Sequence, residues 1–139
     1  MDLILVTSPD PGRAAMATAF LNWLVTPSLA CSIGAVPDPK IEIPPLVTTA
    51  FEELATGRPL LPPSRLTAEL GAWAAEIIYV GCSPSTFPPG AIRATEWDIP
   101  DPTHQPVEEI RAIRDAIYRC AWTLLGERGW SRDLSRAPG

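Results

Sequence analysis

The chain opens with a short apolar run, a tight proline-rich turn and a helical segment, and this order constrains the fold more than any other feature. Residues 3–6 form a continuous apolar run, which predicts a strand buried on both faces. The turn SPDPG follows, and the strong helix formers of residues 13–24 come next, with their larger apolar side chains on one helical face. A strand followed so closely by a helix is the first half of a crossover unit.

The same alternation continues along the chain. Further strands are predicted at residues 29–33, 76–80 and 93–97, and further helices at residues 45–55, 64–75 and 107–125. Alternating strands and helices need crossover connections, which place the strands in parallel and cover both faces of the sheet. We therefore expect an α/β fold, a three-layer αβα sandwich with a four-stranded parallel sheet.

Length and composition limit the number of domains and the classes of partner. A chain of 139 residues has the size of one domain, and we expect that domain at residues 1–127, followed by a polar C-terminal tail at 128–139 that frays from Gly126 onwards. The net charge of -5 opposes binding to nucleic acid or to an anionic membrane. No apolar run approaches the roughly 20 residues that cross a bilayer, and no basic segment precedes the first strand.

The three cysteines are odd in number and widely spaced, without the C-x-x-C spacing of a zinc site or a redox pair. They predict reduced thiols in a soluble, cytoplasmic protein. Nothing in the sequence indicates a metal ion or a cofactor.

Ligands of parallel α/β sheets bind beyond the carboxyl ends of the strands, so the turn after the first strand is the expected site. There the stretch LILVTSPDPGRAAMATAFLN resembles the opening of the low-molecular-weight protein tyrosine phosphatases and thioredoxin-coupled arsenate reductases, which reads V-C-x5-R-[S/T]. Val6 and Arg13 match this pattern, Thr7 stands at the catalytic cysteine, and Ala14 replaces the serine or threonine. The resemblance implies a low-molecular-weight phosphatase-like fold of bacterial type.

Later features follow in the order of that family. Ser32 and Gly34 resemble its Ser-x-Gly after the second strand, and Cys82 follows the third strand. Trp97 with Asp101-Pro102 is similar to the W-x-x-x-D-P of the arsenate reductase variant, which implies that Asp101 holds the general-acid position. The resemblance spans roughly residues 3–125.

The family's chemistry needs a thiolate, a cradle of backbone N–H groups, a helix N-terminus and an arginine, all of which favour an anion. An alcohol such as Thr7 has a far higher pKa than a thiol, and the only histidine, His104, lies beyond the Asp-Pro pair. Pro9 and Pro11 lack N–H donors, and Asp10 adds a carboxylate where an oxyanion would bind. These residues predict a degenerate P-loop that binds anions poorly.

Two candidate residues keep two interpretations. Arg13, beside Ser8 and Asp10, could clasp an anion with its planar fork, or it could pair with Asp10 or Asp101. Asp101 could act as an acid or base, or serve as a turn and N-cap residue ahead of the last helix.

Cys82 and the tryptophans carry weaker signals. Cys82 matches a resolving cysteine of the reductases, but Phe87 stands where its partner is expected, so a redox role is a weak prediction and a loop or core thiol is favoured. Trp97 could be core or wall a pocket, whereas Trp73 and Trp122 lie at helical positions that suit packing.

Three functions follow from these residues. The first is a pseudoenzyme, a catalytically altered or inactive member of that family that acts as a binding or regulatory module for a protein partner or for itself. The second is an enzyme of changed chemistry that uses the loop 7–13 and Asp101 on a small polar or anionic substrate. The third is an active arsenate reductase or phosphotyrosine phosphatase, which the absence of the cysteine disfavours.

Overall fold

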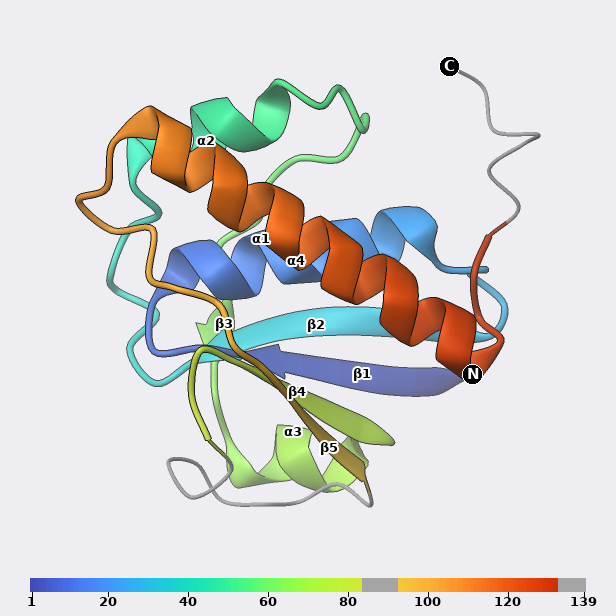
Figure 1. Ribbon diagram of the computed structural model, residues 1–139. Coiled ribbons are helices and arrows are strands. Elements are labelled where there is room, and N and C mark those ends of the chain that lie inside the picture. Colours follow the sequence, from blue (N-terminus) through green and yellow to red (C-terminus); the bar gives the residue numbers. More distant parts are fainter. Residues whose placement is uncertain (84–92, 133–139) are drawn as a thin grey trace.

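The computed structural model describes residues 1–83 and 93–132 and contains one parallel sheet with helices on both faces (Figure 1). The strands are β1 (Asp2–Thr7), β2 (Ala30–Val36), β3 (Ser64–Arg65), β4 (Glu76–Val80) and β5 (Arg93–Trp97). The helices are α1 (Pro11–Leu24), α2 (Pro45–Glu52), α3 (Ala68–Trp73) and α4 (Val107–Arg128). The strands lie in the order β3-β2-β1-β4-β5, and each pairs in parallel with its neighbours. The predicted parallel α/β sandwich is confirmed.

The sheet has five strands in the described residues, one more than predicted. The additional strand β3 occupies the first part of the segment predicted as a helix at 64–75. It forms because residues 64–65 pair with Ala35 and Val36, and Leu66 N–H donates to the carbonyl of Val36 at 2.9 Å. The helix begins only after Thr67, whose hydroxyl accepts from Leu70 N–H at 3.2 Å and caps the first turn.

Three helices cover one face of the sheet and α3 covers the other (Figure 1). The larger core lies between the sheet and α1, α2 and α4, where Phe20 and Phe51 pack with ring centroids 5.1 Å apart. A smaller core around Leu5 and Tyr79 lies on the opposite face. The predicted packing of Trp73 is wrong: the side chain ends the six-residue α3 and is 70% exposed, while Trp122 is 41% exposed.

The chain stays attached to the domain beyond the expected boundary at residue 127. Helix α4 continues to Arg128, and Gly129 ends it with a left-handed φ of 73°, a conformation that glycine adopts without strain. Thr26 N–H donates to the carbonyl of Trp130 at 2.7 Å, and Arg132 N–H to that of Leu24 at 2.6 Å. The predicted fraying from Gly126 is therefore wrong as far as residue 132, and residues 133–139 lie outside the described part. None of the described helices combines the length and apolar character that a bilayer span requires.

Candidate functional site

The turn between β1 and α1 places the predicted site at the carboxyl edge of the sheet. Helix α1 starts at Pro11, whose missing N–H is no loss in a first turn, and Asp10 caps the helix. One carboxylate oxygen of Asp10, Oδ2, accepts from Arg13 N–H at 3.0 Å. The carboxylate therefore lies at the helix N-terminus, where the partial positive charge of the helix favours an anion.

Arg13 is folded back onto this carboxylate. Its Nε donates to Asp10 Oδ1 at 2.5 Å, and its Nη1 donates to the carbonyl of Ile99 at 2.6 Å. Only 5% of Arg13 and 8% of Asp10 is exposed, so the pair is buried. Of the two partners that the sequence allowed for Arg13, the structure selects Asp10.

Gly81 makes room for the guanidinium. A Cβ atom on this residue would fall 1.8 Å from Arg13 Nη1, and its φ of 73° also disfavours a side chain. Neither Gly81 nor Ile99 was predicted from the sequence as part of the site. A glycine directly after a buried strand is a signal that could have found the first, whereas Ile99 contributes a backbone carbonyl that leaves no mark in the sequence.

Ser8 and Thr7 are both fully buried in the same turn. The Ser8 hydroxyl accepts from Ala14 N–H at 3.0 Å and donates to the carbonyl of Asp10. Thr7 Oγ1 has no hydrogen-bond partner among the described residues. Two N–H groups of the helix N-terminus, those of Arg13 and Ala14, are thus bonded to side chains of the turn itself.

Asp101 lies on the loop that crosses the start of α1, but it is exposed. Its Oδ1 accepts from Thr103 N–H at 2.9 Å, which forms a turn, and the residue that caps α4 is Pro106. Within residues 1–83 and 93–132, no hydrogen bond or ion pair joins Asp101 to Arg13. His104 is exposed on the same loop with a φ of 63°. Both side chains belong to an external turn beside the buried pair.

Cys82 follows β4 and is half-buried near this pair. Burial raises the pKa of the Cys82 thiol to about 11; the Arg13 guanidinium opposes the rise, and the carboxylates of Asp10 and Glu96 add to it. The thiol is therefore protonated at neutral pH, the reverse of what a reactive cysteine needs. Phe87 lies outside the described residues.

Trp97 belongs both to the larger core and to the wall of a surface hollow. It is 7% exposed and packs in the larger core, and it also lines a surface hollow of about 430 Å³ together with Gly81, Cys82 and Glu96. As for metals, the described residues hold no group of three or more histidine, cysteine or acidic side chains that could bind one.

The chain is similar to known proteins in its fold but not detectably in its sequence. No model of a known protein family matches the chain, and no curated protein is similar to it in sequence. An arsenate reductase in the oxidized state is 19% identical, with a TM-score of 0.76 over 91% of this chain and 98% of that one. The tyrosine phosphatase Wzb from Escherichia coli K30, solved in complex with sulphate, is 16% identical, with a TM-score of 0.77 over 92% and 99%.

The YwlE arginine phosphatase from Geobacillus stearothermophilus is 22% identical, with a TM-score of 0.68 over 100% of this chain and 99% of that one. The likeness covers nearly the whole length of each of these proteins, so it concerns the fold as a unit and not a shared fragment. This chain therefore has the fold of the low-molecular-weight phosphatases and arsenate reductases, as its sequence pattern predicts.

Proposed function

We propose that this chain is a non-catalytic protein with the low-molecular-weight phosphatase fold, acting as a binding or regulatory module. One observation carries the proposal: the carboxylate of Asp10 occupies the helix N-terminus and the guanidinium of Arg13, where a phosphate group would otherwise bind. The Ser8 hydroxyl takes the next N–H of the helix, and two prolines of the turn offer none.

The energetics disfavour an external anion at this place. A carboxylate three residues from its arginine competes intramolecularly, at an effective concentration on the order of millimolar or more. An incoming phosphate would also meet the negative charge of Asp10 in a buried environment, where like charges repel strongly. Thr7, at the position of the nucleophile, is 0% exposed, so a substrate has no path to its hydroxyl without a rearrangement of the turn.

A binding role needs a partner, and we propose that this partner is another protein or a second copy of this chain. We further propose a cytoplasmic location, because Cys31, Cys82 and Cys120 are free thiols in the structure, as a reducing compartment keeps them.

The proposal is tested by activity measurements on the purified chain. We expect no phosphate release from p-nitrophenyl phosphate or phosphotyrosine and no thiol-dependent reduction of arsenate. The variant Thr7→Cys should also stay inactive, because Asp10 and the prolines remain in the turn. An active phosphatase of the same fold, assayed in parallel, is the positive control. Turnover by the natural chain, or efficient turnover by Thr7→Cys alone, would contradict the proposal.

One observation favours an alternative, an enzyme of changed chemistry that uses the loop 7–13 and Asp101. The Thr7 hydroxyl is buried without a partner in the described structure, which costs stability, and a catalytic role is one explanation for such a group. A panel of small polar and anionic compounds would be screened for those that raise the melting temperature. A compound whose effect disappears in both Arg13→Ala and Asp101→Ala would favour this alternative. An active reductase or phosphatase comes last, because Thr7 replaces the cysteine.

A further inference from the structure

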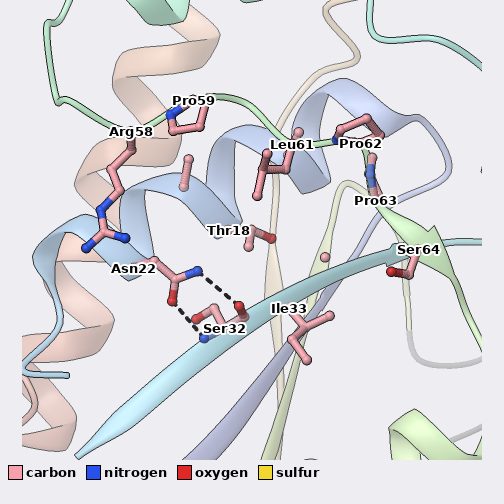
Figure 2. Close-up of a pocket in the computed structure, with 13 residues that line it drawn as sticks. Thr18, Asn22, Ser32, Ile33, Arg58, Pro59, Leu61, Pro62, Pro63 and Ser64 are labelled. Atoms are coloured by element: carbon pink, nitrogen blue, oxygen red, sulfur yellow. Dashed lines mark hydrogen bonds between the residues drawn. The ribbon is translucent and has the colours of Figure 1, made fainter. Parts of the chain in front are cut away.

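A second cavity lies away from the turn 7–13, between α1, β2 and the segment that leads to β3. Its volume is about 270 Å³, and Figure 2 shows the side chains around it. We call residues 58–63 the proline strap, because Pro59, Pro62 and Pro63 lie in it and cross over the cavity (Figure 2). None of the lining residues belongs to the turn, so this cavity is independent of the site described above.

The cavity exists because small residues face each other across α1 and β2. A Cβ atom on Gly34 would fall 2.8 Å from Thr18 Oγ1, so a larger residue here would force the Thr18 side chain to shift. Ala15 and Ala19 continue the floor along α1. Short side chains therefore leave a hollow that the strap covers from outside.

The edge of β2 is closed here by a side chain. Strand β3 pairs with β2 only at residues 35–36 in the described structure. At Ser32, the Asn22 amide takes the place of a neighbouring strand: Nδ2 donates to the Ser32 carbonyl at 3.0 Å, and Ser32 N–H donates to Oδ1 at 2.8 Å (Figure 2). Another strand cannot add at this position without displacing Asn22, so the cavity beside Ser32 is not a sheet edge that is free to pair.

The strap is stiff and its rim is apolar. Each proline restricts the backbone φ to about −65°, so the strap has few conformations to lose when a ligand binds. Leu61 is 67% exposed and Ile33 is 37% exposed at the rim of the cavity. A ligand with an apolar body would cover both side chains.

Three of the polar side chains of the cavity that can donate hydrogen bonds are those of Arg58, Ser32 and Asn22. Arg58 is exposed, and its guanidinium makes no ion pair or hydrogen bond with any residue in 1–83 or 93–132. Ser32 is 8% exposed and lines the cavity, and its hydroxyl has no hydrogen-bond partner in the same set of residues. The Asn22 amide carries a second N–H beside the one that bonds Ser32.

Each of these groups can donate a hydrogen bond, and none of the lining residues carries a carboxylate. In Figure 2 the side chain of Arg58 extends from the strap toward the part of α1 that carries Asn22. Arg58 lines this cavity as a cation that no carboxylate of the described residues neutralises, which is a local exception in a protein with a net charge of -5. The arrangement matches an anionic group on one end of a small molecule.

We propose that this cavity binds a small monocarboxylate with an apolar body. The carboxylate pairs with the Arg58 guanidinium and accepts from the Ser32 hydroxyl, while the apolar body packs against Leu61, Ile33 and the prolines of the strap. The proposal goes beyond the function proposed above and does not depend on it, since it concerns different residues.

The test is an NMR titration of the full chain, labelled with ¹⁵N, using benzoate and its uncharged isostere benzamide as probes. We expect benzoate to produce saturable shifts at the amides of Thr18, Ser32 and Gly34. Benzamide should bind about tenfold more weakly, because it forms no charge-assisted bond with Arg58. The benzoate affinity should also fall as salt is raised.

Variants separate the charge from the shape of the cavity. Arg58→Gln should weaken benzoate about tenfold and leave benzamide unchanged. Arg65→Gln is the matched control, because Arg65 is exposed on β3 and bonds the carbonyl of Pro37 outside the cavity; it should change neither affinity. Ser32→Ala should weaken benzoate more than benzamide.

Three outcomes would overturn the proposal: no saturation by either compound well above millimolar concentration, equal effects of the two arginine variants, or saturable shifts confined to residues 7–13. The activity measurements described above address the turn alone. If those measurements contradicted the proposed function, the benzoate result would still be valid. If benzoate did not bind, the proposed function would be unaffected.

Discussion

Each end of the parallel sheet carries a buried carboxylate paired with an arginine, and the two pairs differ in what they connect. At the carboxyl end, Asp10 and Arg13 are three residues apart and lie at the start of one helix. At the amino end, Glu76 is the first residue of β4 and only 1% exposed. Its two oxygens each accept one bond from Arg128 of α4 at 2.9 Å, and Oε2 accepts another from Thr95 at 2.8 Å.

One pair joins distant segments of the chain, and the other lies at the start of a single helix. Glu76 and Arg128 are 52 residues apart, so their pair ties the last helix to the sheet. Asp10 and Arg13 are three residues apart, and only the bond from Arg13 to the carbonyl of Ile99 reaches a distant segment; in the proposed function the pair uses donors that a phosphate would need. The threonines repeat the contrast, since the hydroxyl of Thr95 is bonded to Glu76 and that of Thr7 has no partner among the described residues.

The largest effect is expected at the amino end. Arg128→Ala leaves the buried Glu76 carboxylate without its charged partner, and breaking a buried pair in this way costs about 3–5 kcal/mol of unfolding free energy. Urea unfolding measures the loss. Arg119→Ala, an exposed arginine on the same helix, is the control and should change the unfolding free energy by less than about 0.5 kcal/mol. Equal effects of the two variants would show that the amino-end pair contributes little.

Asp10→Ala should have the next largest effect, a loss of about 2 kcal/mol, because the helix loses its cap and Arg13 keeps only the carbonyl of Ile99. The freed N–H and guanidinium can then bind an anion. We expect inorganic phosphate to raise the melting temperature of Asp10→Ala more than that of the natural chain, without any turnover. Arg128→Ala should respond to phosphate as the natural chain does, and an equal response of all three proteins would mean that Asp10 blocks nothing.

Replacing each of the two threonines should change the unfolding free energy by a smaller amount, and the two changes should have opposite signs. Thr7→Val removes a buried hydroxyl that has no partner in the described residues and should stabilise the fold by about 1 kcal/mol. Thr95→Val removes the bond to Glu76 and should destabilise it by about 1 kcal/mol. Both are measured by urea unfolding. A loss of stability in Thr7→Val would indicate that this hydroxyl has a partner in solution, and would favour the enzyme of changed chemistry.

The smallest effect concerns the reactivity of Cys82 beside the carboxyl-end pair. Because burial raises the pKa of this thiol to about 11, alkylation by iodoacetamide should be slow near neutral pH and accelerate toward pH 11. The Cys82 thiol of the unfolded chain loses its proton at a lower pH than the same thiol in the folded chain. The stability from this group is therefore complete below about pH 9 and is lost as the pH rises to about 11.

Mass spectrometry of the alkylated chain gives the rate at each cysteine. Asp10→Ala removes a negative charge that raises the pKa of Cys82, so it should modestly increase the rate. Alkylation of Cys82 at neutral pH as fast as that of an unstructured thiol would contradict the burial of this side chain.

Patterns of apolar residues predicted the central strands β1 and β4, because burial on both faces of a parallel sheet demands continuous apolar runs; β5, with the sequence RATEW, is an edge strand without such a run. The bounds predicted for β4 and β5 agree with the structure. Strand β3 could not be predicted, since two residues become a strand only by pairing with residues 35–36. For the site, the sequence allowed Arg13 to bind an anion or to pair with Asp10 or Asp101, and the pair with Asp10 is the one that the structure contains. The bond from Arg13 to Ile99 was not predicted, because its partners are 86 residues apart and one of them is a backbone carbonyl.

The sequence by itself determined the order of the helices and of the strands other than β3, the position of the turn after β1 and the absence of a cysteine at Thr7, because each of these is a local property of neighbouring residues. Only the tertiary structure decided that Arg13 turns onto Asp10 and Ile99, that Thr7 is sealed from solvent, and that a cavity opens beside Ser32. The physical reason is that burial and hydrogen-bond partners depend on segments far apart in the chain, which meet only when the sheet and its helices pack together.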